Sequence, residues 1–390
     1  MKLLFRLPVL MVLSVLLAGC GTMADPREWF GSDDPALEPA ELVDFTPTLK
    51  PKELWSRDIG DASAVLRRLM PAVDNGVLYV ANTDGDLYAM EADSGKTIWQ
   101  IETKLPVSAG PGVAEELVAL GTNEGMLVAF DTHTGEERWR RQLSSEILAV
   151  PAISNGVVVV HTGDGKLFGL DSISGEQLWL YDHKVPVLTL RGSSSPVING
   201  GTVYCGLAGG KMLALSLDSG LVEWEGRITV PSGRSDLERM VDVDADPLVY
   251  SGTVYGGAYQ GDVAALGEGS GKVFWTRKIS VYNNMAVNWQ QLAVTDAQGF
   301  VWSLDPDTGA ARWRQKLLMN RKLSPPALQG EYTVVGDYEG YLHWLSSHDG
   351  SMAARQRVGD AIVVAPLIVD DILYVLASDG KLTALALPEQ

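Results

Sequence analysis

The stretch DGKLFGLDSISGEQLW, residues 164–179, has two close copies earlier in the chain. They are DGDLYAMEADSGKTIW at 84–99 and EGMLVAFDTHTGEERW at 124–139. In each, two glycines lie ten residues apart and a tryptophan follows the second glycine after four residues. Short alternating apolar and polar runs between such turn residues are typical of antiparallel strands. The copies therefore predict a repeated β-meander.

The same spacing continues through the rest of the chain. Looser copies end at Trp224, Trp275 and Trp313, and one around Gly350 has Ala354 at the tryptophan position. The glycine pairs are Gly85 and Gly95, Gly125 and Gly135, Gly165 and Gly175, Gly210 and Gly220, Gly261 and Gly271, Gly299 and Gly309, and Gly340 and Gly350. A single four-stranded meander exposes both faces and two edges, so the copies are expected to stack radially as a β-propeller.

The two ends of the repeat predict how the ring closes. Counting Trp55, there are eight tryptophan positions, and the last copy has its first glycine at Gly380 but lacks a fourth strand before Gln390. Trp55 lies in ELWSRDI, which reads as a fourth strand without the preceding three. We therefore predict an all-β fold of eight four-stranded antiparallel blades, with the N-terminal strand completing the last blade and leaving no free edge.

The repeated side chains have a structural interpretation. We expect each tryptophan to lie on an outer strand, wedged between blades, rather than to stack on a ligand. Aspartates at the start of the last turn of a copy favour turn formation over catalysis. These are Asp93, Asp131, Asp171, Asp218 and Asp305.

The N-terminus reads as a lipoprotein leader. Its apolar run, residues 7–18, is shorter than the ~20 residues that a membrane-spanning helix needs. The sequence Leu-Ala-Gly-Cys at 17–20 resembles the bacterial lipobox, which implies removal of residues 1–19 and acylation of Cys20. Similar lipoproteins without an aspartate after the cysteine are sorted to the outer membrane, and here Gly21 follows. Residues 20–52 are rich in Pro, Asp and Glu and are expected to be a flexible tether to a propeller over 53–390.

Composition excludes nucleic acids as partners and a disulfide bond in the mature chain. The formal charge is −18, and −20 without the leader that contains Lys2 and Arg6, so the chain repels nucleic-acid backbones. Cys205 is the one cysteine left after Cys20 and has no disulfide partner. It is expected to be a small buried apolar residue.

Departures from the repeat indicate where function lies, because the repeating part builds the ring. The interval from a tryptophan to the next first glycine is 26 residues after Trp99 and Trp139, but 31 after Trp179 and 37 after Trp224. The added residues belong to the connections from the fourth strand of one copy to the first strand of the next. The two insertions are therefore expected on the same face of the ring, at neighbouring blades.

The insertions contain the stretches VLTLRGSSSP, 187–196, and RITVPSGRSDLERMVDVDADP, 227–247. The interval after Trp55 is also long, and AVLRRLM, 64–70, is expected to extend the same face. In the first stretch, Leu188 and Leu190 share a face of an extended segment, next to Arg191. They either cover their own blade or form an exposed apolar anchor for a partner.

The second insertion is acidic, and its spacing raises the question of calcium. Asp242, Asp244 and Asp246 have the first three spacings of an EF-hand loop. However, Pro247 stands at the glycine position and Thr253 at that of the bidentate glutamate, which disfavours a metal. The remaining alternatives are a solvated acidic loop and a docking surface for a basic or strand-edge partner.

The repeats, with the phase D-x-x-(x)-G-x-x-x-W, resemble the quinoprotein-type eight-bladed propeller over residues 53–390. One such family contains pyrroloquinoline-quinone (PQQ) dehydrogenases, and another is the BamB family of the outer-membrane β-barrel assembly machinery. The lipobox, tether, domain length and loops resemble BamB. This resemblance implies a lipid-anchored outer-membrane scaffold that faces the periplasm, docks on the POTRA domains of BamA and assists barrel folding and insertion. The matching partner-binding residues are Leu188, Leu190, Arg191, Asp242 and Asp244.

The resemblance leaves two points open. Arg191 could pair with the aspartates inside the protein or reach the partner. Unfolded client chains could also contact the propeller, by adding a strand to an outer edge.

Enzyme chemistry finds little support in the residues. The chain lacks adjacent cysteines, a nucleophile-elbow motif and a phosphate-binding loop. Its histidines show no metal-ligand spacing; they are His133, His161, His183, His343 and His348. We therefore predict no catalytic residues, metal or cofactor. The alternatives are a propeller that binds peptidoglycan or another glycan and, less favoured, a PQQ-type enzyme.

Overall fold

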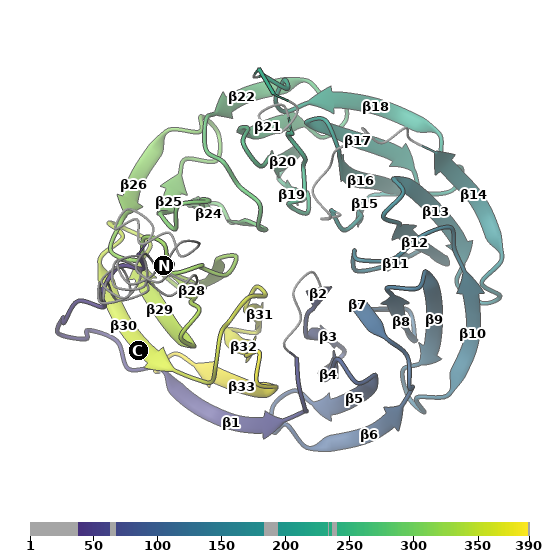
Figure 1. Cartoon of the computed structure of the whole chain (residues 1–390), viewed down its shortest axis with the longest axis horizontal. Helices are drawn as coiled ribbons and strands as arrows, with labels where there is room; N and C mark the ends of the chain where they lie inside the picture. The colour runs from purple at the N-terminus through teal and green to yellow at the C-terminus, as the bar shows by residue number, and fades with distance from the viewer. Residues whose placement is uncertain (1–37, 63–67, 183–193, 233, 236–239, 389–390) are drawn as a thin grey trace, which may run out of the picture. The chain divides into compact units, whose positions relative to one another are not determined.

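The computed structural model describes residues 38–388 except 63–67, 183–193, 233 and 236–239. Residues 40–390 form one compact unit. Figure 1 shows that unit as a ring of eight blades, each built on four antiparallel strands ordered from the axis outward. Seven blades use four consecutive strands, the eighth joins β31–β33 to β1, and the short strand β2 adds a fifth, parallel strand to the second blade. Within the described residues, no helix is long and apolar enough to cross a membrane. The predicted eight-bladed propeller is confirmed.

The blades follow the chain in order, and the first, second, third and fourth contain the following strands. They are β3 (Ala72–Asp74), β4 (Val77–Ala81), β5 (Asp86–Glu91) and β6 (Thr97–Glu102); β7 (Val107–Ala114), β8 (Leu117–Thr122), β9 (Met126–Asp131) and β10 (Glu137–Gln142); β11 (Ala152–Ser154), β12 (Val157–His161), β13 (Lys166–Asp171) and β14 (Gln177–Asp182); and β15 (Val197–Asn199), β16 (Thr202–Leu207), β17 (Lys211–Ser216) and β18 (Val222–Arg227).

The other four blades have the same plan. Their strands are β19 (Leu248–Tyr250), β20 (Thr253–Gly257), β21 (Val263–Gly267) and β22 (Val273–Arg277); β23 (Ala286–Val287), β24 (Leu292–Thr295), β25 (Val301–Leu304) and β26 (Ala311–Gln315); β27 (Ala327–Gln329), β28 (Tyr332–Gly336), β29 (Tyr341–Ser346) and β30 (Met352–Arg357); and β31 (Leu367–Val369), β32 (Ile372–Leu376), β33 (Lys381–Ala386) and β1 (Lys52–Asp58).

The eighth blade closes the ring as predicted. Its outer strand β1 pairs antiparallel with β33, with Lys52 opposite Ala386 and Trp55 opposite Ala384. No turn connects these two strands, because they come from opposite ends of the chain. The closure therefore depends on hydrogen bonds and side-chain packing alone.

The tryptophan and the second glycine of the repeat form a lock between neighbouring blades. In the best-defined copy, Trp139 is 8% exposed and its indole Nε1 donates to the Ser172 carbonyl of the next blade at 2.8 Å. A Cβ atom at Gly175 would lie 2.7 Å from the Trp139 ring, and Gly175 has a φ of +68°. Only glycine meets both demands without strain. The predicted wedge role of the tryptophans is confirmed.

Seven of the eight seams between blades carry this tryptophan lock. The other six pairs are Trp55 and Gly95, Trp99 and Gly135, Trp179 and Gly220, Trp224 and Gly271, Trp275 and Gly309, and Trp313 and Gly350. The constant spacing in the sequence thus records contacts between blades as well as turns within them.

The seam between blades seven and eight differs. Ala354 takes the tryptophan position on β30, and its cross-strand partner on β29 is Trp344, where every other blade has a small residue. The large and small side chains have exchanged strands. Trp344 is fully buried and its Nε1 donates to Gln329 Oε1 at 2.9 Å. Gln329 Nε2 in turn donates to the Asp371 carbonyl of blade eight at 2.8 Å.

Candidate docking surface

The long connections predicted from the sequence all lie on one face of the ring. Successive strands of a blade alternate in direction, so connections from an outer strand to the next inner strand share a face. The longest are 228–247 between β18 and β19, 183–196 between β14 and β15, and 59–71 between β1 and β3. We call this the long-loop face. The ends of both insertions that the structure describes, 194–196 and 240–247, therefore lie on the face that the repeat count predicted.

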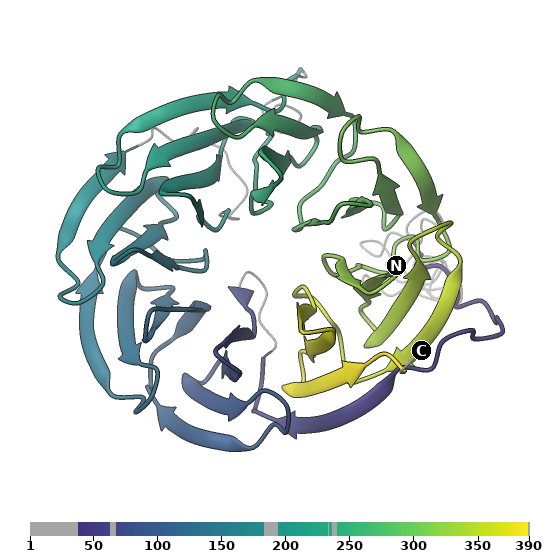
Figure 2. The same cartoon turned by 180° about the vertical axis from the view of Figure 1, so that it is seen from behind.

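The connection 59–71 carries the short strand β2 (Arg68–Leu69), which pairs in parallel with β7. Figures 1 and 2, two opposite views of the ring, both show β2 near the ring axis, and its pairing adds it to the axial edge of the second blade. This pairing holds the backbone of Arg68 beside Ala109 of β7.

Arg68 joins loops from opposite sides of the ring. Its guanidinium forms an ion pair with Asp246, and its Nη2 donates to the Asp244 carbonyl at 2.7 Å. Nη1 also donates to Ser195 Oγ at 3.3 Å. Arg68 precedes the first blade and Asp246 precedes the fifth, which is its opposite in a ring of eight. One side chain therefore connects all three long connections.

Asp246 gathers further donors. Its Oδ1 accepts from the Ser195 backbone N–H at 2.6 Å, and its Oδ2 accepts from Asn284 Nδ2 at 2.6 Å. Ser195 Oγ accepts from the Val150 N–H at 3.0 Å. We call Arg68, Ser195, Asp246 and Asn284 the loop hub. It unites the ends of both insertions with connections from three other blades.

Arg68→Met is expected to lower the free energy of unfolding by about 2–3 kcal/mol, because Asp246 would lose its charged partner in a mostly buried setting. Urea denaturation would measure the change. Arg357→Met is the matched control, since the Arg357–Asp360 pair spans 3.7 Å on the surface and is expected to contribute less than about 1 kcal/mol. Equal effects of the two substitutions would show that the hub does not stabilise the fold.

Asp242 is buried and hydrogen-bonded to the turns of blades four and five. It is 4% exposed, its Oδ1 accepts from the Gly209 N–H at 3.3 Å, and its carbonyl accepts from the Tyr259 N–H at 3.0 Å. It also forms an isolated antiparallel bridge with Ala208. The inner end of the second insertion is thus held against the turns of blades four and five.

Asp244 is 6% exposed, and the described residues donate no hydrogen bond to its carboxylate. Burial raises the pKa of Asp244 to about 7, and the negative charge of Asp242 adds to the rise while Arg68 opposes it. A carboxyl group with such a pKa carries a proton in a large fraction of molecules near neutral pH.

The structure places two of the five sequence-predicted site residues. Asp242 and Asp244 lie beside the loop hub, whereas Leu188, Leu190 and Arg191 fall within 183–193 and lie outside the described residues. The choice between a covering and an exposed role for the leucines therefore stays open.

None of the four hub residues was among the predicted site residues. Ser195 lies at the end of the first insertion, and Asp246 was considered only for its calcium-like spacing. The stretch 64–70 was expected on this face, but nothing singled out Arg68, and Asn284 lies in a connection of ordinary length. The only available signal was the arginine pair Arg67 and Arg68 between apolar residues, and it does not say which of the two enters the hub.

The calcium-like spacing of the aspartates has another explanation. Both carboxylate oxygens of Asp246 already accept hydrogen bonds from protein donors, which belong to Arg68, Ser195 and Asn284. Across the described ranges, no group of three His, Cys, Asp or Glu side chains is arranged to hold a metal ion.

Cys205 lies behind the hub, fully buried in the core between blades three and four. Its Sγ is 3.4 Å from His161 Nδ1, and burial raises the pKa of the thiol. A buried thiol with a raised pKa is a poor nucleophile. The expectation of a small buried residue is confirmed.

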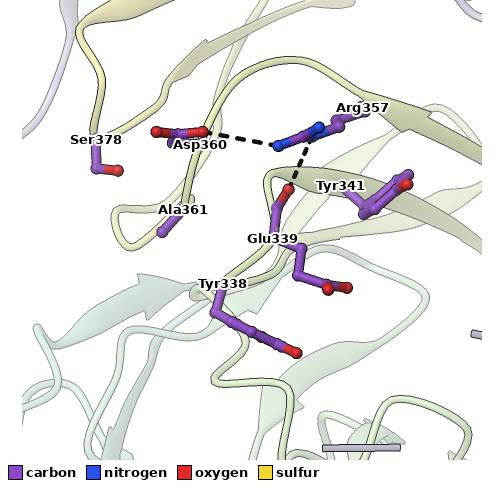
Figure 3. A pocket seen from close by; sticks show the side chains of 7 residues that line it. All are labelled: Tyr338, Glu339, Tyr341, Arg357, Asp360, Ala361 and Ser378. Carbon is purple, nitrogen blue, oxygen red and sulfur yellow. Dashed lines mark hydrogen bonds and ion pairs between the residues drawn. The ribbon is translucent and has the colours of Figure 1, made fainter. Parts of the chain in front are cut away.

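A separate hollow of about 400 Å³ lies on the long-loop face between blades seven and eight (Figure 3). Its lining residues are Tyr338, Glu339, Tyr341, Arg357, Asp360, Ala361 and Ser378. Arg357 crosses it, donating from Nε to the Glu339 carbonyl at 3.1 Å and approaching Asp360. The hollow does not share residues with the loop hub.

Comparison with known proteins settles the family. The model of the family "Outer membrane protein assembly factor BamB" matches residues 48–107, 83–315 and 297–387, which together span the propeller. The chain belongs to the BamB family. The predicted resemblance is confirmed.

Relatives and a solved structure agree with this assignment. BamB of Alkalilimnicola ehrlichii is 49% identical over 377 residues, with 96% of this chain and 95% of that protein covered. BamB of Pseudomonas aeruginosa is 48% identical over 377 residues, with 96% and 97% covered. The crystal structure of BamB from Moraxella catarrhalis has a TM-score of 0.80 at 26% identity and covers 86% of this chain and all of that one.

Proposed function

We propose that this chain is an outer-membrane protein assembly factor that acts as a scaffold and carries out no chemistry of its own. Its relatives are named as outer membrane protein assembly factors. The observation that carries the proposal is the loop hub, which ties the departures from the repeat into one surface while the repeated residues lock the blades. A rigid ring with one specialised face suits a docking module.

The partner is the set of periplasmic POTRA domains of BamA, bound through the long-loop face. Asp242 and Asp244 are buried, so their part is to hold the loop backbone in position. Direct contact then falls to Leu188, Leu190 and Arg191 of the first insertion. An apolar pair beside an arginine is a composition found at binding hot spots.

Attachment to the membrane follows from the N-terminus. Cys20 carries the lipid in the outer membrane, and the propeller faces the periplasm. The net charge of −18 supports anchoring through the lipid alone, because anionic lipid surfaces repel an acidic domain.

Leu190→Glu is expected to weaken binding to the BamA periplasmic domains at least tenfold, because a buried leucine contributes about 1.5–3 kcal/mol. A pull-down or titration with the mature chain measures this. Leu178→Glu is the matched control, because Leu178 is 51% exposed on β14 and should keep full binding.

A second variant tests the aspartates. Asp242→Arg with Asp244→Arg is expected to abolish binding and also to destabilise the fold, since both sites are buried. Leu190→Glu is therefore the decisive change. Unaltered binding by folded Leu190→Glu protein would mean that the docking site has been assigned wrongly.

A further inference from the structure

Residues 40–49 run from the connection between β26 and β27 to β30 of blade seven before the chain enters β1. The Ala40 N–H donates to the Met319 carbonyl at 2.9 Å, and the Thr48 and Leu49 N–H groups donate to the Ala353 carbonyl at 3.0 and 3.1 Å. In Figure 1 this purple segment runs beside β30 and continues into β1. We call residues 40–49 the strap.

Two arginines hold the strap by its backbone. Arg321 Nη1 donates to the Ala40 carbonyl at 2.9 Å, and Arg355 Nη2 donates to the Val43 carbonyl at 3.1 Å. The Arg355 guanidinium also lies 5.2 Å from the centre of the Phe45 ring, within the range of a cation–π contact. This half of the strap is therefore fixed at Ala40 to the connection that leads into blade seven and at Val43 to β30.

The strap covers a buried charge network. Arg321 is 2% exposed, and its Nε donates to Asp337 Oδ2 at 2.8 Å. Asp337 also accepts from His343 Nε2 at 2.9 Å, and the two side chains are fully buried. The Ala40 carbonyl supplies an acceptor for a buried arginine nitrogen that a protein interior would otherwise leave unpaired. Contact with the strap thus completes the network.

Leu49 enters the core at the seam between blades seven and eight. It is 8% exposed and belongs to one cluster with Ala354 of blade seven and Leu373 of blade eight. Leu42 packs on a second cluster that contains Trp313. Leu49 therefore packs into the core that contains Ala354, the residue at the eighth tryptophan position.

This seam needs additional packing for a topological reason. A tryptophan lock requires a glycine in the turn between the third and outer strands of the next blade, and blade eight has no such turn because β33 and β1 are not consecutive. The same two strands are the closing pair of the ring. Without the strap, tension on the N-terminal side of β1 would first separate Lys52 from Ala386.

We propose that the strap is a closing clamp of the ring, which reinforces the seam between blades seven and eight and transfers tension from the anchored N-terminus to blade seven. The closing pair β1–β33 is then shielded from pulling. The role in tension rests on the proposed lipidation of Cys20, whereas reinforcement of the seam does not.

Hydrogen exchange of the mature chain tests the clamp. Replacing residues 40–49 with a Gly/Ser segment of equal length should make β1 and β33 exchange roughly tenfold or more faster, while β12 and β13 keep their wild-type rates. The matched control replaces residues 28–37 in the same way and should change neither region. Unchanged exchange in β1 and β33, or equal acceleration in every blade, would overturn the proposal.

A milder pair of variants covers the case in which the replaced strap prevents folding. Leu49→Ala with Arg355→Met removes one core contact and one hydrogen bond to the strap backbone. Hydrogen exchange in β1 and β33 should again become faster, but by a smaller factor. In single-molecule pulling from the two chain ends, the first rupture should occur at lower force in these variants. A rupture force equal to wild type would contradict the role in tension.

The clamp and the docking proposal fail separately. Strap variants should bind the BamA periplasmic domains as wild type does, because the described contacts of the strap are with blade seven and the connection leading into it, and none is with a residue of the loop hub. Faster hydrogen exchange in β1 and β33 together with unchanged binding to the BamA periplasmic domains supports the clamp and leaves the docking proposal unaffected.

Discussion

Trp139→Ala should lower the free energy of unfolding of the propeller by about 3–5 kcal/mol, the range for removing a large buried aromatic side chain. The Trp139 ring fills the seam between blades two and three, and its Nε1 satisfies the Ser172 carbonyl of the next blade. The substitution would leave a cavity against Gly175 and an unpaired carbonyl group. Thermal unfolding followed by circular dichroism measures the loss.

Trp289→Ala is the matched control for this prediction. Trp289 is 77% exposed in the connection between β23 and β24, so its removal should change stability by less than about 0.5 kcal/mol. Comparable destabilisation by the two substitutions would show that position in the seam does not determine the contribution of a tryptophan.

Asp244→Asn should stabilise the folded protein by up to about 4 kcal/mol at pH 8, because burial raises the pKa of Asp244 to about 7 and its ionised form is therefore disfavoured in the folded state. The folded-state pKa of about 7 exceeds the ordinary aspartate pKa of 3.8, so the folded state binds more protons than the unfolded state between these pH values. Stability of the wild type therefore falls as pH rises from about 4 to 7. The amide cannot ionise, so the variant lacks this part of the fall.

Urea denaturation at pH 4 and pH 8 measures the difference. The gain from Asp244→Asn should be small at pH 4 and large at pH 8. Asp360→Asn, at an exposed surface position, serves as the control and should change stability by less than about 0.5 kcal/mol at both pH values. A gain of equal size at both pH values would mean that ionisation of Asp244 is not its cause.

These two predictions concern two different parts of the molecule, the repeated framework and the long-loop face. Trp139 belongs to the repeated framework, where each contact stabilises the ring. Asp244 belongs to the long-loop face, where a buried carboxylate destabilises the ring at neutral pH. Destabilising polar groups persist at functional sites when the surrounding structure holds them in place.

The candidate site was only partly predictable. The count of residues between tryptophans and glycines located both insertions, because a connection that grows leaves the rest of the repeat unchanged. The aspartates at 242 and 244 were compatible with a solvated loop, and the structure buries them. Their burial depends on the loops that cover them, and no neighbouring residue in the sequence reports that cover.

The exchange of Trp344 and Ala354 shows a second limit. The repeat count puts Trp344 on the third strand of its blade, four residues after Gly340, as Ala129 follows Gly125. Only the structure shows that Trp344 pairs across the strands with Ala354, so that the large and small side chains have exchanged places.

From the sequence alone follow the number of blades, the strand that closes the ring and the face that carries the insertions. These features depend on turns, alternation and spacing, which act within about one repeat of the chain. The tertiary structure decided the loop hub and the strap. Arg68 and Asp246 are 178 residues apart, and Arg321 and Ala40 are 281 apart. Such pairs meet only when the ring has closed, and their interaction is set by the three-dimensional distance that closure creates.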